Sequence, residues 1–376
     1  MVIHISSFMG LSIKGLLFTN LEGLYQKAVK RALKRSKLSR KKFDRLHGGQ
    51  AERLMEGFDD AMLKVTRKYL TDEIGYYYKG ILAVQKYIGK RYAKSFRLYF
   101  AYLSACHIIV ENGLKEIGIK AMNTTTTEAI SFGLFARLLR VADQVGILLL
   151  NGYADAALVV WRTFYEQAIV LTFLAEQNDE ALSLRFRDHS ILYSKRLSES
   201  YSKRLLTEGF DALEAETLQG ITDNYARLAN EHGKMFVDKD YGWLNGVPGI
   251  SGKPSFNAIE EFLKMERYRP FYIWASTFTH GSFSVFDNVM EDDGLFAGRI
   301  KEVTIDQDGL VDPMQITLSV LQRAAEPFLK LISDEAEVEL NIRLLDGLYD
   351  QLIRHFQKEA MREEGRRKAS DHQDRG

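Results

Sequence analysis

The fold is decided by residues 136–176, which read ARLLRVADQVGILLLNGYADAALVVWRTFYEQAIVLTFLAE. Two apolar segments flank Asn151-Gly152, a pair suited to a left-handed helix C-cap followed by a turn. Each segment is longer than an ordinary strand and contains no proline. The stretch therefore predicts an αα-hairpin with helices near 128–150 and 153–176. Because both helices are apolar on most of their circumference, we expect them in the middle of the molecule.

Each of these two helices also carries a thin polar line at helical spacing. The lines consist of Arg140, Gln144 and Asn151 on the first helix and Asp155, Arg162 and Glu166 on the second. An ionisable group on a mostly buried helix must find a partner or shift its pKa. Arg162 and Glu166 therefore predict either a buried ion pair that fixes the register of the bundle or a guanidinium held ready for a phosphate or carboxylate ligand.

Composition narrows the class of protein. The chain has 376 residues, 46% of them hydrophobic and 27% charged, which suits a globular protein with a substantial core. Its 51 Lys+Arg and 50 Asp+Glu give a net charge of +1, so no overall field attracts nucleic acid or a membrane. Cys106 is the single cysteine, which excludes an intrachain disulfide and favours a reducing compartment.

Neither the start of the chain nor its most apolar window predicts a targeting or membrane segment. The first residues lack a basic region and a small-residue cleavage site. The window 156–174 is long enough to span a bilayer, but it holds Arg162, Glu166 and Gln167 at its centre. We therefore expect a cytoplasmic protein that does not associate with a membrane.

The expected fold class is all-α: a multi-helix bundle with an N-terminal helical extension and a C-terminal helix. The sequence predicts an extension over 1–122, a central bundle over 123–335, a helix over 336–366 and a disordered tail over 367–376. Within the bundle, Thr125 and Glu128 fit a capping box, and Asn178-Asp179 caps a helix predicted over 178–206.

Residues 238–256 differ in composition from the helical segments around them. They read DKDYGWLNGVPGISGKPSF and are rich in Gly, Pro, Asp and Asn, which predicts a long irregular loop with Tyr241 and Trp243 as anchoring aromatics. Loops of this length inside a compact helical domain often carry function. Trp243 is therefore a candidate ligand contact.

A second polar constellation lies on a helix predicted over 270–281. Tyr272, Ser276 and His280 follow at intervals of four residues, on one face. His280 in the last turn indicates either an imidazolium stabilised by the helix dipole or a general acid/base beside the polar line. Ser276 is a weak candidate nucleophile, because a mid-helix serine usually bonds to its own backbone.

Motifs for metals, cofactors and phosphate-binding glycine loops do not occur in the sequence. It contains no H-E-x-x-H and no cysteine pair, and the acidic group at 291–293 lacks calcium-loop spacing. We therefore expect no metal and no cofactor.

Two of these segments carry a resemblance. W-R-T-F-Y-E at 161–166 and S-T-F-T-H-G-S at 276–282 resemble a family of uncharacterised, mainly bacterial, all-helical proteins. The family pattern is Arg-[Ser/Thr]-x-x-Glu followed by Ser-x-x-x-His-[Gly/Pro]-Ser, and it is matched by Arg162, Thr163, Glu166, Ser276, His280 and Ser282. The resemblance covers roughly 130–290. It implies an all-helical domain and supplies no established activity.

The chain is also similar, more loosely, to HEPN-type helical domains, many of which are ribonucleases in toxin and antiviral systems. Active members use Arg-x(4–6)-His on a helix, and no arginine stands at that distance before His280. Arg227 and His232 fit the spacing inside a predicted core helix, although roughly two such matches are expected by chance in this chain.

This similarity implies a protein that binds RNA or a nucleotide. If the protein is catalytic, the similarity implies a metal-independent ribonuclease in a toxin or phage-defence role. His280 or His232 would take the 2′-hydroxyl proton and Arg162 would stabilise the developing charge. The candidate catalytic residues are His280, Arg162, Glu166, His232 and Arg227. The candidate ligand contacts are Arg140, Tyr272, Ser276 and Trp243.

The competing interpretation is a non-catalytic interaction module that binds a protein partner or a second copy of the chain. In that case the polar line of Arg162 and Glu166 only specifies how the bundle packs. Convergence of Arg162, Glu166 and His280 on a solvent-reachable site would favour ligand binding. Enclosure of the Arg162–Glu166 pair by apolar side chains would favour the module.

Overall fold

The computed structural model describes residues 75, 78–119, 124–204, 208–280, 309–333 and 335–373. The first 74 residues of the expected helical extension, the motif residue Ser282 and the acidic group at 291–293 lie outside these residues. The chain forms two compact units, and every element described below belongs to the larger, Ile88–Ile300 with Ile305–Gly376.

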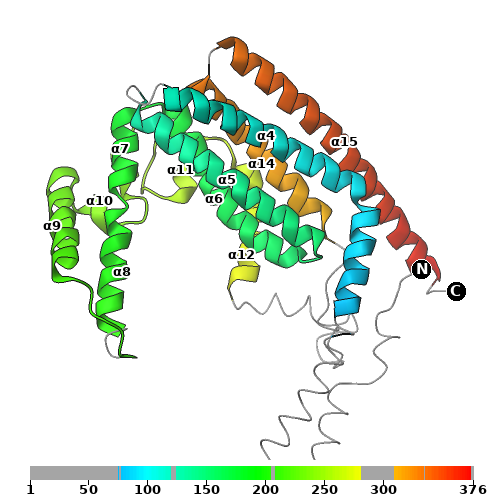
Figure 1. The fold of residues 1–376 in the computed structure, drawn as a ribbon, viewed down its shortest axis with the longest axis horizontal. Helices are drawn as coiled ribbons and strands as arrows, with labels where there is room; N and C mark the ends of the chain where they lie inside the picture. Colours follow the sequence, from blue (N-terminus) through cyan, green and yellow to red (C-terminus); the bar gives the residue numbers. More distant parts are fainter. Residues whose placement is uncertain are drawn as a thin grey trace, which may run out of the picture. The chain divides into compact units, whose positions relative to one another are not determined.

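The described elements are all helical, which confirms the all-α prediction for this part of the chain. A central bundle contains α4 (Ala93–Ile119), α5 (Thr126–Leu150), α6 (Ala154–Gln177), α14 (Val311–Ile332) and α15 (Glu335–Gln373) (Figure 1). Between α6 and α14 the chain forms α7 (Glu180–Asp188), α8 (Ile191–Arg204), α9 (Ala215–His232), α10 (Lys234–Asp238), η3 (Gly242–Leu244), α11 (Phe256–Phe262), η4 (Glu266–Tyr268) and α12 (Arg269–Thr279).

The predicted αα-hairpin is confirmed in α5 and α6. Helix α5 ends at a cap on Asn151, and Gly152 takes φ +82°, the left-handed conformation that the turn requires. Its start is the predicted capping box: the Thr125 side chain accepts from the backbone N–H of Glu128, whose carboxylate accepts from the backbone N–H of Thr125.

The core lies where α5 and α6 meet α14. Phe135 on α5 stacks on Phe328 of α14, with ring centroids 4.1 Å apart. On α6, Trp161, Phe164 and Tyr165 are fully buried. Helix α6 is long and apolar enough to cross a membrane, but 61% of its most apolar window is buried inside the molecule. It therefore packs as the core helix that the sequence predicted.

The N-terminus of α5 has a second cap that the sequence did not predict. The carboxylate of Glu180, on α7, accepts hydrogen bonds from the backbone N–H groups of Thr126 and Thr127 at 2.9 and 3.1 Å. These bonds lower the pKa of Glu180, led by its interaction with the Thr126 side chain. A carboxylate at a helix N-terminus also opposes the positive end of the dipole, so Glu180 fixes α7 against α5.

Two predicted helix boundaries are wrong. The helix expected over 178–206 divides into α7 and α8, because His189 turns inward between them and its Nε2 lies 2.8 Å from the carbonyl of Lys239. The tail expected to be disordered over 367–376 is helical as far as it is described, because α15 continues to Gln373.

Candidate functional site

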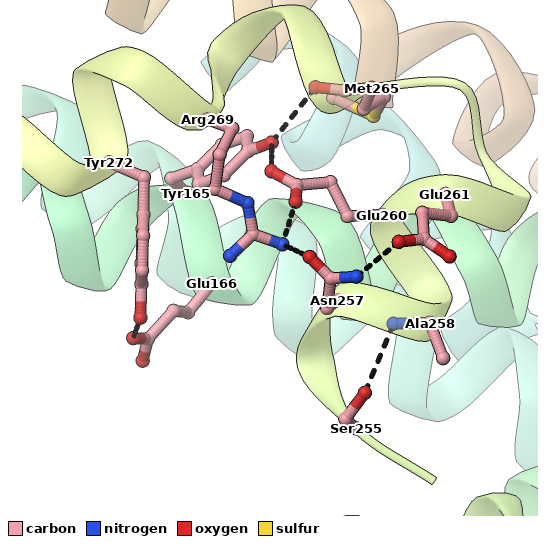
Figure 2. Close-up of polar contacts among 10 residues, drawn as sticks. All are labelled: Tyr165, Glu166, Ser255, Asn257, Ala258, Glu260, Glu261, Met265, Arg269 and Tyr272. Carbon is pink, nitrogen blue, oxygen red and sulfur yellow. Dashed lines mark hydrogen bonds and ion pairs between the residues drawn. The ribbon is translucent and has the colours of Figure 1, made fainter. Parts of the chain in front are cut away.

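Arg162, Glu166 and Tyr272 form one polar cluster between α6 and α12, called here the Arg–Tyr–Glu cluster. The hydroxyl of Tyr272 donates to Oε1 of Glu166 at 2.6 Å (Figure 2) and accepts from Nη2 of Arg162 at 3.2 Å. Nε of Arg162 lies 3.4 Å from the same Oε1 but is not aligned for a hydrogen bond. Tyr272, on α12, therefore bridges the two members of an ion pair that lies on α6.

The ring of Tyr272 also holds the guanidinium of Arg162. The guanidinium carbon lies 5.1 Å from the ring centroid, a cation–π distance. Burial alone would lower the pKa of Arg162, but the hydrogen bond to Tyr272 and the charge of Glu166 outweigh it and raise the pKa. Burial and the hydrogen bond to Glu166 raise the pKa of Tyr272, so this hydroxyl remains a donor.

The cluster lies at the edge of the core rather than inside it. The side chains of Arg162 and Glu166 are 24% and 36% exposed. Of the two alternatives that the sequence left open for this pair, full enclosure does not hold, because α6 leaves both side chains partly exposed. The pair is thus neither sealed by apolar side chains nor freely hydrated, and part of each side chain is open to solvent.

Two further tyrosines border the cluster from other elements. Tyr193 on α8 is 56% exposed, and Tyr241 lies just before η3. Burial raises the pKa of both, and the charge of Glu166 adds to the rise in each case. The charge of Glu166 therefore acts on the hydroxyls of both tyrosines. Packing links Tyr241 to the cluster, because its ring centroid lies 6.3 Å from that of Phe256, which stacks on Tyr272.

A second cluster, which is buried, lies next to the first and consists of Tyr165, Glu260 and Arg269. Glu260 on α11 is fully buried, and its Oε1 accepts from the hydroxyl of Tyr165 at 2.5 Å, with the carbonyl of Met265 as a second acceptor at 3.1 Å (Figure 2). Arg269 forms an ion pair with Glu260 and donates to Asn257. Tyr165 precedes Glu166 in α6 and Arg269 precedes Tyr272 in α12, so this cluster fixes both helices of the site.

Charge and aromatic packing join the two clusters. The guanidinium of Arg269 lies 5.7 Å from the ring of Tyr272, which therefore interacts with the cations of both clusters. Phe256 stacks on Tyr272 at 5.2 Å and meets Tyr165 edge-on at 5.8 Å. Burial raises the pKa of Glu260 although Tyr165 and Arg269 act against the rise. This cluster has the character of a rigid support, because none of its carboxylate is open to solvent.

The predicted convergence of His280 with the polar line is wrong. His280 caps the C-terminus of α12 and is exposed, and within the described residues no contact joins it to Glu166. The place beside Glu166 is taken by Tyr272, about 12 Å earlier along the helix at 1.5 Å per residue. Ser276 donates to the carbonyl of Tyr272 at 2.7 Å, which confirms the backbone bond expected for a mid-helix serine.

The second candidate pair, Arg227 and His232, does not converge either. Arg227 donates to Glu231 at 2.7 Å and to Asn224 at 2.8 Å on its own helix. His232 ends α9, and its ring packs against Phe236 with centroids 4.5 Å apart. Positions five apart on a helix face different ways, so the sequence spacing does not build a catalytic pair here.

The remaining predicted ligand contacts lie elsewhere. Arg140 is exposed on α5, where its polar line faces solvent, and no described contact links it to the cluster. Trp243 is buried between Phe173 and Phe186, at centroid distances of 6.0 and 5.0 Å, so it anchors the loop and cannot meet a ligand. Tyr193 and Tyr241 are the site residues that the sequence missed.

The described residues contain no group of His, Cys, Asp and Glu side chains arranged to hold a metal ion. No match was found among curated proteins or among solved structures. A family model does match part of the chain, and the matched part includes α6, α8, α11 and α12, which carry the site. Over residues 128–296, this chain is thus similar to the Family of unknown function (DUF5677).

Proposed function

We propose that this protein binds RNA or a nucleotide-type ligand on the face that carries the Arg–Tyr–Glu cluster, Tyr193 and Tyr241. One observation carries the proposal: the partly exposed guanidinium of Arg162 is held by Tyr272, and the charge of Glu166 beside it acts on Tyr193, which is more than half exposed. Proteins that bind single-stranded RNA combine arginine with aromatic rings on which bases stack.

The charge balance of this face favours recognition of the base over recognition of the phosphate. Glu166 offsets the charge of Arg162, and Asp240 offsets that of Arg196 on α8. Neutralised arginines release few counterions when RNA binds, so the affinity should depend weakly on salt. Stacking and hydrogen bonds to bases would then supply most of the binding free energy.

The proposal stops at binding. A metal-independent ribonuclease needs a base near the group that stabilises the developing charge. Neither His280 nor His232 contacts the cluster within the described residues. Cleavage, and with it the toxin or defence role that the HEPN-type resemblance implied, stays a prediction from sequence.

The test is a titration of fluorescein-labelled single-stranded RNA with the full chain, followed by anisotropy. We expect Arg162→Ala to weaken binding by roughly 5- to 150-fold, because a stacked base contributes roughly 1–3 kcal/mol. Arg343→Ala is the matched control: it removes the same charge from α15, where Arg343 is 76% exposed and paired with Glu339 on its own helix.

Equal binding by wild type and Arg162→Ala, with both proteins folded by circular dichroism, would show that the cluster does not bind RNA. The same samples, incubated with a chelator and run on a gel, report on cleavage. RNA cleaved by wild type but intact with His280→Ala would support the ribonuclease instead.

A non-catalytic interaction module is the second candidate, and a different observation favours it. Helix α12 exposes two large apolar side chains, Ile273 at 58% and Trp274 at 38%. Arg162, Glu166 and Tyr272 also bond to one another without a ligand. Sedimentation of the free chain, compared with Ile273→Glu, tests this: a dimer lost in the variant would favour the module.

A further inference from the structure

The Arg–Tyr–Glu cluster leaves one carboxylate oxygen of Glu166 available to a ligand. The hydrogen bond from Tyr272 and the contact from Arg162 both go to Oε1. Among the described residues, Oε2 has no partner, and the side chain is 36% exposed. The Tyr272 bond and the neighbouring guanidinium hold the carboxylate in place, so Oε2 is a fixed acceptor.

The charges of Arg162 and Glu166 limit the kinds of ligand group that can bind to this oxygen. A ligand ammonium on Glu166 would lie close to the guanidinium of Arg162, which is 3.4 Å from the same carboxylate. A phosphate on Arg162 would meet the charge of Glu166 at similarly short range. A neutral group with N–H donors meets neither repulsion, and an ionised carboxylate is an acceptor-only group.

We propose that Glu166 makes this site selective for guanine, whose N1–H and N2–H donate to the open edge of the carboxylate. This inference rests on the proposed binding of RNA or a nucleotide. Guanine presents two adjacent N–H donors on its pairing edge. On adenine, cytosine and uracil every such donor has an acceptor beside it, and that lone pair would point at the carboxylate.

Tyr193 and Tyr241, on which the charge of Glu166 acts, carry chemical groups that suit the rest of the guanine ring. Tyr193 is exposed enough to stack on a base, and within the described residues neither its hydroxyl nor that of Tyr241 makes a hydrogen bond. Burial and nearby carboxylates raise the pKa of both, so both hydroxyls keep their protons. A protonated hydroxyl can donate to O6, the one acceptor on that edge of guanine.

The test uses labelled oligouridine RNAs that differ at one central position, which is guanine, inosine, adenine, cytosine or uracil. We expect wild type to bind the guanine RNA roughly 5- to 150-fold more tightly than the uracil RNA, the range for a bidentate base contact. The inosine RNA, which lacks the N2 amine, should fall between them. Glu166→Gln should still bind but should lose the guanine preference, because its amide can accept from Tyr272 only by turning the NH₂ group toward the ligand.

Glu176→Gln is the matched control, because Glu176 lies on the same helix and pairs with Arg323 outside the cluster. It should keep the preference. An unchanged guanine preference in Glu166→Gln would overturn the inference. So would RNA binding that depends on Arg162 but is equal for all five RNAs, and the proposed function would then stand. If wild type binds none of the RNAs, both proposals are wrong.

Discussion

Tyr272 donates a 2.6 Å hydrogen bond to Glu166 across 106 positions of sequence, and in doing so it joins α12 to α6. The same hydroxyl accepts from Arg162, so one tyrosine completes an ion pair formed within a single helix turn. The ring beneath that hydroxyl packs on Phe256 and lies near the guanidinium of Arg269. Tyr272 therefore connects the open cluster to the buried one.

Tyr272→Phe should distinguish the contribution of the hydroxyl to stability from that of the ring. The variant keeps the aromatic packing but leaves Glu166 and Arg162 without their shared partner. We expect the free energy of unfolding to fall by about 0.5–1.5 kcal/mol, the net value of a hydrogen bond at a partly hydrated site. Urea denaturation measures it. Tyr193→Phe serves as the control and should change stability by less than about 0.5 kcal/mol, since the Tyr193 ring is largely exposed.

Arg162→Ala should cost little stability, because the pair is partly hydrated. A sealed pair would lose about 3–5 kcal/mol when one partner is removed. Here Glu166 keeps the Tyr272 bond and is 36% exposed, so about 1 kcal/mol is expected. A loss above about 3 kcal/mol in urea denaturation would show that the carboxylate is buried after all.

Glu260→Ala should be far more damaging than any change in the open cluster. It removes the buried carboxylate that Arg269 and the Tyr165 hydroxyl share and leaves them only Asn257 and the Met265 carbonyl, which costs about 3–5 kcal/mol. Glu260→Gln keeps an acceptor for Tyr165 and should cost less. Equal losses in the two variants, measured by thermal unfolding, would contradict the role of the charge.

His189 should make stability depend on pH. Burial lowers its pKa, against the bond to the Lys239 carbonyl and the charge of Asp240, so the folded protein holds a neutral imidazole. The unfolded chain takes up a proton near the ordinary pKa of about 6.5. Stability is therefore retained above that pH and is lost as pH falls toward the lowered folded-state pKa.

Urea midpoints measured from about pH 7.5 to about pH 5 check this, with His189→Gln as the comparison. Burial also lowers the pKa of His355, which contributes a similar trend to both proteins. The difference between the two pH profiles therefore reports on His189. Parallel profiles would show that His189 does not titrate differently in the folded and unfolded states.

Much of the fold was predictable because its signals are local. The apolar length of two segments and the Asn151-Gly152 break predicted the α5–α6 hairpin. What the sequence could not give was the direction in which each polar line faces. Arg140 and Arg162 have the same helical context, yet Arg140 lies in open solvent while Arg162 meets Tyr272. Only the packing of α12 against α6 makes that distinction.

The candidate site was predictable in part. Spacing placed Arg162 with Glu166 and placed Tyr272 on a polar face, and the structure brings these three together. The same spacing placed His280 on that face, but α12 ends just before it and Tyr272 already occupies the position beside Glu166. Sequence spacing shows which residues share a face of a helix but not which of them contacts the neighbouring helix. Spacing alone therefore could not decide whether Tyr272 or His280 contacts Glu166.

Two caps on one helix show what the sequence by itself determined and what only the tertiary structure decided. Thr125 and Glu128 are three residues apart, so the capping box follows from local backbone geometry and could be predicted from the sequence. Glu180 caps the same helix from 54 positions away, because the packing of α7 brings it to Thr126. The charge of Glu166 acts on Tyr193 and Tyr241 for the same reason. Bonds within one turn depend on neighbouring residues, whereas contacts between elements depend on how the whole core packs, and no short stretch of sequence contains that information.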